Sequence, residues 1–257
     1  MQRIAVYGKG GVGKSVVATS LSAAFALSGK KVLHVGCDPK HDSAVRLLEK
    51  GSKMVTVLDA LANDTTGTST ENVIHRGRHG IDCCEAGGPQ PGLGCGGRGV
   101  ARTLEFIDEM DVIASGGYQV LMFDVLGDVV CGGFAAPLRQ GFAEKVIIVI
   151  SEEPMALFAA NNIARAIHVY HPNGVVLAGL VASLRSPTAD RAFLERFAQA
   201  LSTQILTYVP RDPLITSAER ACMTVVEESP ASDSAKAFRS LATTIEALNP
   251  ATTALPT

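Results

Sequence analysis

Apolar segments recur along the chain, and most of them end at or beside a Gly, Asp or Ser residue. They lack the alternation of apolar and polar positions that marks a strand with one face in water. A parallel sheet covered by helices on both faces buries every position of its strands, so its strands are continuous apolar runs. The pattern therefore predicts such strands over Ile4–Tyr7, Val32–Gly36, Val120–Asp124, Val146–Ser151, Val175–Ser183 and Ile205–Val209.

Helical patterns lie between several of these segments, over Ser15–Leu27, Met155–Tyr170 and Ala189–Leu201. Strands that alternate with helices predict an α/β fold, in which a mostly parallel β-sheet is flanked by helices on both faces. In such sheets the ligand lies at the carboxyl ends of the strands. A last helix near residue 248 has its apolar residues on one stripe, at the spacing of a core-facing helix: Ala235, Phe238, Leu241, Ile245 and Leu248.

Composition adds the size of the folding unit. The chain has 257 residues, of which 47% are hydrophobic and 19% charged, a balance that allows a large buried core. No Pro/Gly/Ser-rich linker divides it, so we expect a single domain over residues 1–257, with 249–257 as a short tail.

Charge and hydropathy bear on the partners. The net charge is −2 and no run of like charges occurs, so we expect neither nucleic acid nor an anionic membrane surface as a partner. No stretch approaches the roughly 20 apolar residues of a membrane helix. The first predicted strand begins so close to Met1 that we expect no signal peptide, and hence a cytoplasmic protein with reduced thiols.

A glycine-rich loop between the first strand and the first helix matches the P-loop pattern G-x-x-x-x-G-K-[ST]. Its backbone N–H groups are suited to wrap phosphates at a helix N-terminus, its second lysine adds a charge, and its serine offers a hydroxyl to Mg²⁺. The pattern predicts a P-loop NTPase that binds ATP and Mg²⁺. The loop consists of Gly8, Lys9, Gly10, Gly11, Val12, Gly13, Lys14 and Ser15.

Carboxylates follow two further strands. Asp38 and Asp42 lie after the second strand, and Asp124 and Asp128 lie at the end of the third. An isolated Asp in such a place is most often a helix N-cap. Beside a P-loop, however, these side chains are suited to hold Mg²⁺ through its water shell or to orient the attacking water.

Two of the six cysteines lie among glycines. Cys95 is in the glycine-rich stretch Gly87–Gly99, and Cys131 is followed by two glycines. Small neighbours leave a thiol unshielded and let backbone N–H groups approach a bound sulfur. Two thiolates are half of the ligands of a 4Fe-4S cluster, and a symmetric dimer supplies the other half on its two-fold axis.

The other cysteines carry weaker signals. Cys83 and Cys84 end a short apolar segment and Cys222 lies in a helical pattern, so we expect all three in the core. Cys37 borders the carboxylate loop after the second strand, and its role stays open.

Over nearly its whole length the chain resembles the nitrogenase iron protein family. The matching segments occur in the family order and at nearly the family spacing: YGKGGVGKS, CDPKHDS, GGPQPGLGCGGRGV, FDVLGDVVCGGFAAP, FAANNIARAI, VPRDP and MTVVEE. The resemblance implies a homodimer that hydrolyses MgATP and passes single electrons from one 4Fe-4S cluster to a separate catalytic protein. It also implies ferredoxin or flavodoxin as the source of those electrons.

The resemblance also implies a role for individual residues. Lys9 would reach across the dimer to the partner's nucleotide, and Ser15 would bind Mg²⁺. Asp38, Lys40 and Asp42 would form the first switch, and 124–128 the second, with Asp128 orienting water. The remaining matches are Pro210, Arg211 and Asp212 on the adenine side, Cys95 and Cys131 as cluster ligands, and Arg98 as the partner-facing arginine that some members ADP-ribosylate.

Two departures favour a nitrogenase-like reductase over nitrogenase itself. Ser183 replaces the family's adenine-side asparagine, and only 249–257 follow the last helix where the family has a long tail. The electron acceptor is then a methylthio-alkane or tetrapyrrole reductase, with dinitrogen reduction as the alternative. A partition or positioning ATPase shares the P-loop type but needs a basic surface, and an iron–sulfur scaffold ATPase needs a C-x-x-C pair; neither feature is in the sequence.

Overall fold

The computed structural model describes residues 1–40, 42–63, 69–89, 95–127, 132–139 and 141–253. Within them one sheet of eight strands has the order β3-β4-β2-β5-β1-β6-β7-β8. All neighbouring strands are parallel except β3 and β4. The strands are β1 Gln2–Gly8, β2 Val32–Cys37, β3 His75–Arg76, β4 Asp82–Glu85, β5 Val120–Val125, β6 Lys145–Ile150, β7 Val176–Ser183 and β8 Ile205–Val209.

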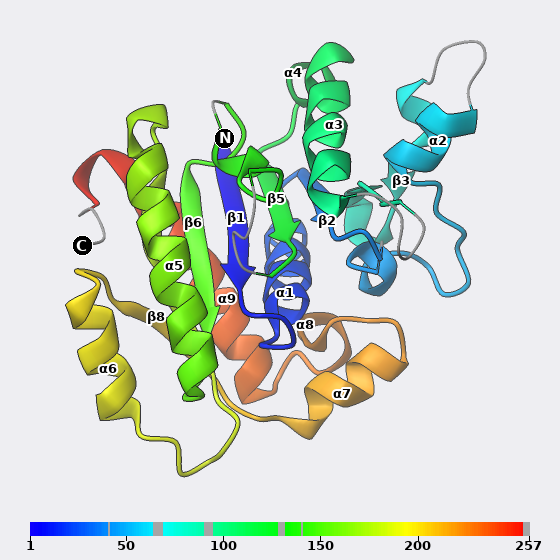
Figure 1. Cartoon of the computed structure of the whole chain (residues 1–257). Helices are drawn as coiled ribbons and strands as arrows, with labels where there is room; N and C mark the ends of the chain where they lie inside the picture. Colours follow the sequence, from blue (N-terminus) through cyan, green and yellow to red (C-terminus); the bar gives the residue numbers. More distant parts are fainter. Residues whose placement is uncertain (41, 64–68, 90–94, 128–131, 140, 254–257) are drawn as a thin grey trace.

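Helices cover both faces of this sheet (Figure 1). Helices α1, α8 and α9 pack on one face, and α3, α5 and α6 pack on the other. No helix of the described residues is long and apolar enough to cross a membrane. The helices are α1 Lys14–Leu27, α2 Val57–Asn63, α3 Gly96–Glu109, α4 Val112–Gly116, α5 Pro154–Tyr170, α6 Arg191–Ala200, α7 Pro213–Arg220, α8 Val225–Glu228 and α9 Asp233–Ala247.

The side chains of the central strands belong to two hydrophobic cores, one on each face of the sheet. In β1, Ala5 and Tyr7 belong to the core under α3 and α5, whereas Ile4 and Val6 belong to the core under α1 and α9. Successive side chains of a strand point to opposite faces, so a continuous apolar run serves both cores. The predicted α/β fold and the six predicted strands are therefore confirmed, with ends that differ by one or two residues.

The largest element that the hydrophobic pattern missed is α3, which begins inside the glycine-rich stretch. Glycine lowers helix stability by about 1 kcal/mol relative to alanine, which is why the stretch gave no helical signal. Close packing requires these glycines: a Cβ on Gly96 would lie 2.4 Å from Cγ of Pro39, and one on Gly99 would lie 2.7 Å from Cδ1 of Leu58. The stripe formed by Val100, Leu104 and Ile107 then holds α3 on the sheet.

The strand register brings distant segments to one edge. Val6 of β1 and Gly36 of β2 both lie beside Asp124 of β5. Each of these strands ends within three residues of that point, at Gly8, Cys37 and Val125. The P-loop, the segment after β2 and the end of β5 therefore meet at the carboxyl edge of the sheet, as the parallel topology requires.

Candidate functional site

A cavity of about 490 Å³ lies at this carboxyl edge. It is bordered by the P-loop, by the segment after β2, by the end of β5 and by the segments after β7 and β8. Most of the predicted nucleotide residues meet there, although they come from four separate parts of the chain. Those that line the cavity are Gly10, Gly11, Gly13, Lys14, Ser15, Asp38, Lys40, Asp42, Asp124, Pro210, Arg211 and Asp212.

The P-loop has the backbone that its glycines predict. Gly8 has φ +143°, and a Cβ there would lie 2.4 Å from the carbonyl oxygen of Val149, so only glycine fits. Helix α1 begins at Lys14 directly after Gly13, so the N-terminus of the helix lies at the end of the loop. Nζ of Lys14 donates to the carbonyl of Lys9 at 3.2 Å, which holds the lysine over the loop.

Asp124 is the buried acid of the site. Its Oδ2 accepts the Ser43 hydroxyl at 2.5 Å. Burial raises the pKa of Asp124, while hydrogen bonds from Ser15 and Ser43 and the charge of Lys14 lower it. A divalent cation beside Ser15 would favour the ionised carboxylate further, because a nearby positive charge lowers a carboxyl pKa.

The segment after β8 forms another wall. Asp212 caps α7 by accepting from N of Leu214 at 2.9 Å, and its other oxygen accepts from the Ser234 hydroxyl at 2.8 Å. The predicted adenine-side segment is thus rigidly attached to α7 and α9. Ser183 lies at the cavity too, 3.3 Å from the place of a Cβ on Gly13.

Arg185 is a site residue that the sequence reading missed. Its Nη2 donates to the carbonyl of Gly11 at 2.6 Å, and the residue lines the cavity. The Glu152 carboxylate accepts from the backbone N–H groups of Arg185 and Ser186, at 3.0 to 3.1 Å, and so fixes this loop. A lone Arg in a loop after a strand carries no pattern of its own, and only the fold brings it to the P-loop.

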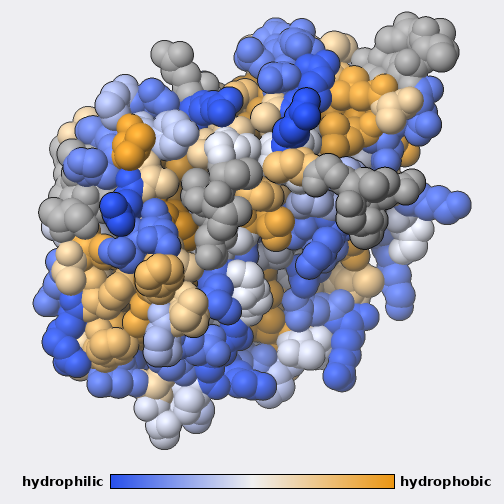
Figure 2. Space-filling view, viewed as in Figure 1, coloured by the Kyte–Doolittle hydropathy of each residue, from blue (hydrophilic) through white to orange (hydrophobic). Residues whose placement is uncertain are grey.

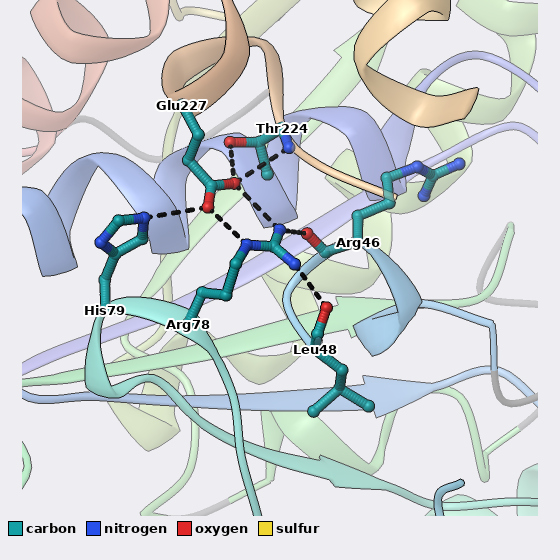
Figure 3. A network of polar contacts seen from close by, with 6 residues as sticks. All are labelled: Arg46, Leu48, Arg78, His79, Thr224 and Glu227. Carbon is teal, nitrogen blue, oxygen red and sulfur yellow. Dashed lines mark hydrogen bonds and ion pairs between the residues drawn. The ribbon is translucent and has the colours of Figure 1, made fainter. Parts of the chain in front are cut away.

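A second missed feature joins the turn after the first switch to the N-terminus of α8 (Figure 3). Arg78 donates to the carbonyls of Arg46 and Leu48, and it pairs with Glu227 at 2.9 Å. Thr224 donates to the same carboxylate, and His79 lies 3.0 Å from it. Arg46 itself lines the cavity. We refer to Arg46, Arg78 and Glu227 as the arginine clamp.

The cysteine site is a second place where separate segments converge. Cys95 is exposed and precedes the first turn of α3. Gly133 packs directly on Gly97: a Cβ on Gly133 would lie 2.2 Å from the carbonyl carbon of Gly97. The carbonyl of the next residue, Phe134, accepts the Tyr7 hydroxyl at 2.9 Å. Gly97 follows Cys95 by two residues, and Gly133 follows Cys131 by two residues, so the segments after the two predicted ligands are in contact. Cys131 itself and Asp128 lie outside the described residues.

Cys95 is thus exposed at the N-terminus of a helix, with glycines on both sides of it in the sequence. Among the described residues, no group of three or more His, Cys, Asp or Glu side chains is placed to hold a metal ion.

A groove of about 660 Å³ lies beside Cys95, between α2 and α3. Arg98 and Arg102 line it on α3, and Leu58 and Ala62 line it on α2. In the space-filling view, hydrophobic surface is visible between these two helices (Figure 2). The predicted partner-facing residue Arg98 thus lies with Cys95 on one surface. Lys9, by contrast, is half-buried and does not line the cavity at the carboxyl edge of the sheet.

The remaining cysteines divide as follows. Cys37, Cys83 and Cys84 are fully buried, and burial raises the pKa of each thiol. The core prediction is confirmed for Cys83 and Cys84. It is wrong for Cys222, which is half-buried in the link between α7 and α8 and has φ +56°. Helix α7 ends at Arg220, two residues before Cys222, so Cys222 does not lie in the helix that the pattern predicts.

The fold is shared with P-loop ATPases of known structure. The cell division ATPase MinD of Pyrococcus furiosus has a TM-score of 0.74 at 24% identity, over 96% of this chain and 99% of that chain. A ParA family ATPase from Chlorobium tepidum has a TM-score of 0.68 at 18% identity, over 95% and 99%. Cobyrinic acid a,c-diamide synthase from Mycobacterium smegmatis, solved with ADP and magnesium, has a TM-score of 0.65 at 22% identity, over 95% and 93%.

The sequence itself matches a family model, described as 4Fe-4S iron sulfur cluster binding proteins of the NifH/frxC family, over residues 2–257. That match covers the P-loop, the cavity and both cysteine segments. The chain therefore belongs to the NifH/frxC family of iron–sulfur cluster binding proteins, built on a P-loop ATPase fold.

Proposed function

We propose that this protein is the ATP-driven reductase component of a nitrogenase-like system. Two subunits would bind one 4Fe-4S cluster through Cys95 and Cys131 of each, and the whole chain would act as one ATPase domain. The observation that carries the proposal is the contact of Gly133 with Gly97, because it draws both cysteine segments to one place. Such a cluster supplies one-electron redox chemistry when bound.

ATP hydrolysis is assigned to the cavity residues. The backbone N–H groups of residues 10–15 and the charge of Lys14 would hold the phosphates, and Ser15 would bind Mg²⁺. Asp38 would position Mg²⁺ and its water, and Asp128 would orient the attacking water. Lys9 does not line the cavity of its own subunit, which is compatible with a role across the dimer, at the partner's phosphates.

The two sites are connected by one short segment. Asp124 lies at the cavity, and seven residues further along the chain is Cys131. Beyond it, Phe134 is tied to Tyr7 of β1 by the 2.9 Å hydrogen bond. A movement of this segment when the γ-phosphate leaves would reach the cysteine site directly, as in switches that a phosphate orders.

The electron acceptor would be a separate catalytic protein. The surface that carries Cys95, Arg98 and the groove between α2 and α3 is the proposed docking area, since electrons travel best over the shortest distance from the cluster. A methylthio-alkane or tetrapyrrole reductase is favoured by Ser183, which lines the cavity in place of the family's asparagine, and by the short tail, with nitrogenase as the alternative. Ferredoxin or flavodoxin would supply the electrons.

The test is anaerobic purification followed by iron and sulfide analysis and electron paramagnetic resonance of the dithionite-reduced protein. The expected result is about four iron atoms per dimer and the spectrum of a reduced 4Fe-4S cluster. Cys95→Ser and Cys131→Ser should each abolish the spectrum, whereas the control Cys222→Ser should keep it. Protein without iron, or a Cys95→Ser variant that retains its cluster, would contradict the proposal.

The second candidate is a partition or positioning ATPase, which the fold shared with MinD and ParA favours. It predicts ATP-dependent, salt-sensitive binding to DNA or to anionic liposomes. Cosedimentation of the purified protein with either surface separates the two candidates, because the reductase is expected to bind neither.

A further inference from the structure

A row of buried polar side chains runs from α1 to the nucleotide cavity. Ser22 Oγ lies 2.9 Å from Nδ1 of His34, and His34 Nε2 lies 2.8 Å from Oγ of Ser43. Ser43 in turn donates to Asp124 at 2.5 Å. Ser22, His34 and Ser43 are fully inaccessible to solvent, and Asp124 is nearly so. His34 is in the middle of β2, among positions that the sequence pattern assigns to an apolar strand.

The chemistry of the four groups determines the direction of every hydrogen bond. The single hydroxyl proton of Ser43 is given to Asp124, so Ser43 Oγ must accept from His34 Nε2–H. A neutral imidazole then has Nδ1 as an acceptor, and Ser22 donates to it. Burial lowers the pKa of His34 to about 3, which agrees with a neutral ring. His34 is therefore the Nε2–H tautomer.

Ser43 is the point at which the first switch rejoins the fold. It follows Asp38, Lys40 and Asp42, which line the cavity, and it precedes a turn of 3-10 helix that begins at Ala44. The N–H of Ala44 is held by Oε1 of Glu85 at 2.6 Å. Two buried side chains from two strands thus fix adjacent residues, and the one that points Ser43 at Asp124 is His34.

We propose that His34 is a positioning residue for ATP hydrolysis, which directs the Ser43 hydroxyl to Asp124 and thereby holds the end of the first switch against the Mg²⁺ side of the cavity. The proposal rests on the proposed nucleotide site. A histidine with only a structural role would need one hydrogen-bond partner for each ring nitrogen, and the position of that partner relative to the cavity would not matter. Here the second partner is itself bonded to the cavity acid, so rotation of Ser43 would change how Asp124 faces a cation.

A matched pair of variants tests the role of Nε2. The amide nitrogen of Gln reaches about as far as Nε2 of His, whereas Asn reaches only as far as Nδ1. His34→Gln should therefore keep a donor to Ser43 and stay within about threefold of the wild-type kcat. His34→Asn should lose it, and kcat should fall by about ten- to a hundredfold, the usual cost of a misplaced group near the chemistry. Equal rates for the two variants would overturn the proposal.

A second comparison separates position from stability. The double variant Ser22→Val, His34→Leu replaces both members of a polar pair by apolar groups, a change that is often nearly neutral for folding. We expect a Tm close to that of the wild type and the same loss in kcat as for His34→Asn. A double variant with wild-type Tm and wild-type kcat would overturn the proposal, and if it does not fold, the Gln and Asn variants decide.

Two readouts keep this inference distinct from the proposed function. In ¹⁵N NMR of histidine-labelled protein, His34 should show the Nε2–H tautomer and no titration between about pH 5.5 and 8. If the wild type hydrolyses no ATP, the proposed function fails, and the effect of Mg²⁺ on ATP affinity is then compared between the Gln and Asn variants by calorimetry. A His34 that titrates in that range, or the same effect of Mg²⁺ in both variants, would contradict the role of His34.

Discussion

At the residue scale, Glu85 carries the clearest dependence on pH. It is buried behind the first switch, and its Oε2 has no hydrogen-bond partner among the described residues. Burial raises its pKa to about 8, and the carboxylates of Asp124, Asp42 and Asp38 act in the same direction, against the hydrogen bond from Ala44. The folded protein therefore holds a proton on Glu85 that the unfolded chain loses above about pH 4.5.

The sign follows from proton linkage. Because the folded pKa lies above the unfolded one, the stability contributed by this proton is complete below about pH 4.5 and is lost as pH rises to about 8. The loss is at most about 1.4 kcal/mol per pH unit. Glu85→Gln should remove this dependence on pH. The free energy of unfolding in urea of the variant, relative to that of the wild type, should therefore rise between pH 5 and 8. Parallel pH curves for the two proteins would contradict it.

A substitution at Gly133 would test the proposed cysteine site. A Cβ at this position would meet the backbone of Gly97 at 2.2 Å, so Gly133→Ala must push the two segments apart. We expect loss of cluster iron with little change in ATP binding, measured by iron analysis and by calorimetry. The matched control is Gly132→Ala, whose Cβ would come no closer than 3.7 Å to Nη2 of Arg139 and should keep its iron. Full iron content in Gly133→Ala would show that this contact is not needed.

At the scale of elements, the arginine clamp joins the turn after the first switch to α8. The ion pair at its centre is largely buried, because the side chain of Arg78 is 14% exposed and that of Glu227 is 3% exposed. Burial by itself raises the pKa of Glu227, but hydrogen bonds from Arg78 and Thr224 outweigh it and lower the pKa. Removal of one partner leaves a buried charge without its counter-ion, so the pair is costly to break.

Arg78→Met should therefore lower the free energy of unfolding by about 3–5 kcal/mol. Arg102→Met is the control, since Arg102 is 39% exposed and pairs with Glu109, which is 58% exposed, at the surface, where an ion pair is worth about 0–1 kcal/mol. Chemical denaturation of both variants gives the comparison. If the two losses are alike, the clamp adds no more than a surface pair.

At the scale of the whole molecule, the proposed chemistry needs two subunits. Lys9 does not line the cavity of its own subunit, and Cys95 with Cys131 supplies only half of a cluster's ligands. Lys9→Ala should keep ATP affinity within a few-fold but lower kcat by about 10³-fold or more, the effect of losing a charge supplied in trans. Steady-state ATPase assays check this, and light scattering should show a dimer in both proteins. Wild-type kcat in Lys9→Ala would remove the argument for action in trans.

Local sequence patterns were enough to predict the α/β fold of the protein and part of its candidate site. Parallel strands are apolar throughout because both their faces are covered, and a P-loop is a contiguous stretch, so both are visible along the chain. The topology then places Asp38 and Asp124 at one edge without further information. Both residues line the same cavity as Pro210, Arg211 and Asp212.

Other features depend on distances that no local pattern contains. Helix α3 begins with glycines because Pro39 and Leu58 leave no room for a side chain at Gly96 or Gly99. Arg185, Arg78 and Glu85 have ordinary neighbours in sequence, and each acquires its partner from a segment at least 30 residues away. His34 lies within a segment that the sequence pattern assigns to an apolar strand, and in the folded molecule it links α1 to Asp124 through Ser22 and Ser43. The sequence alone determined which residues face inward, whereas only the tertiary structure decided which buried polar groups meet, because a hydrogen bond requires its partners within about 3 Å of each other.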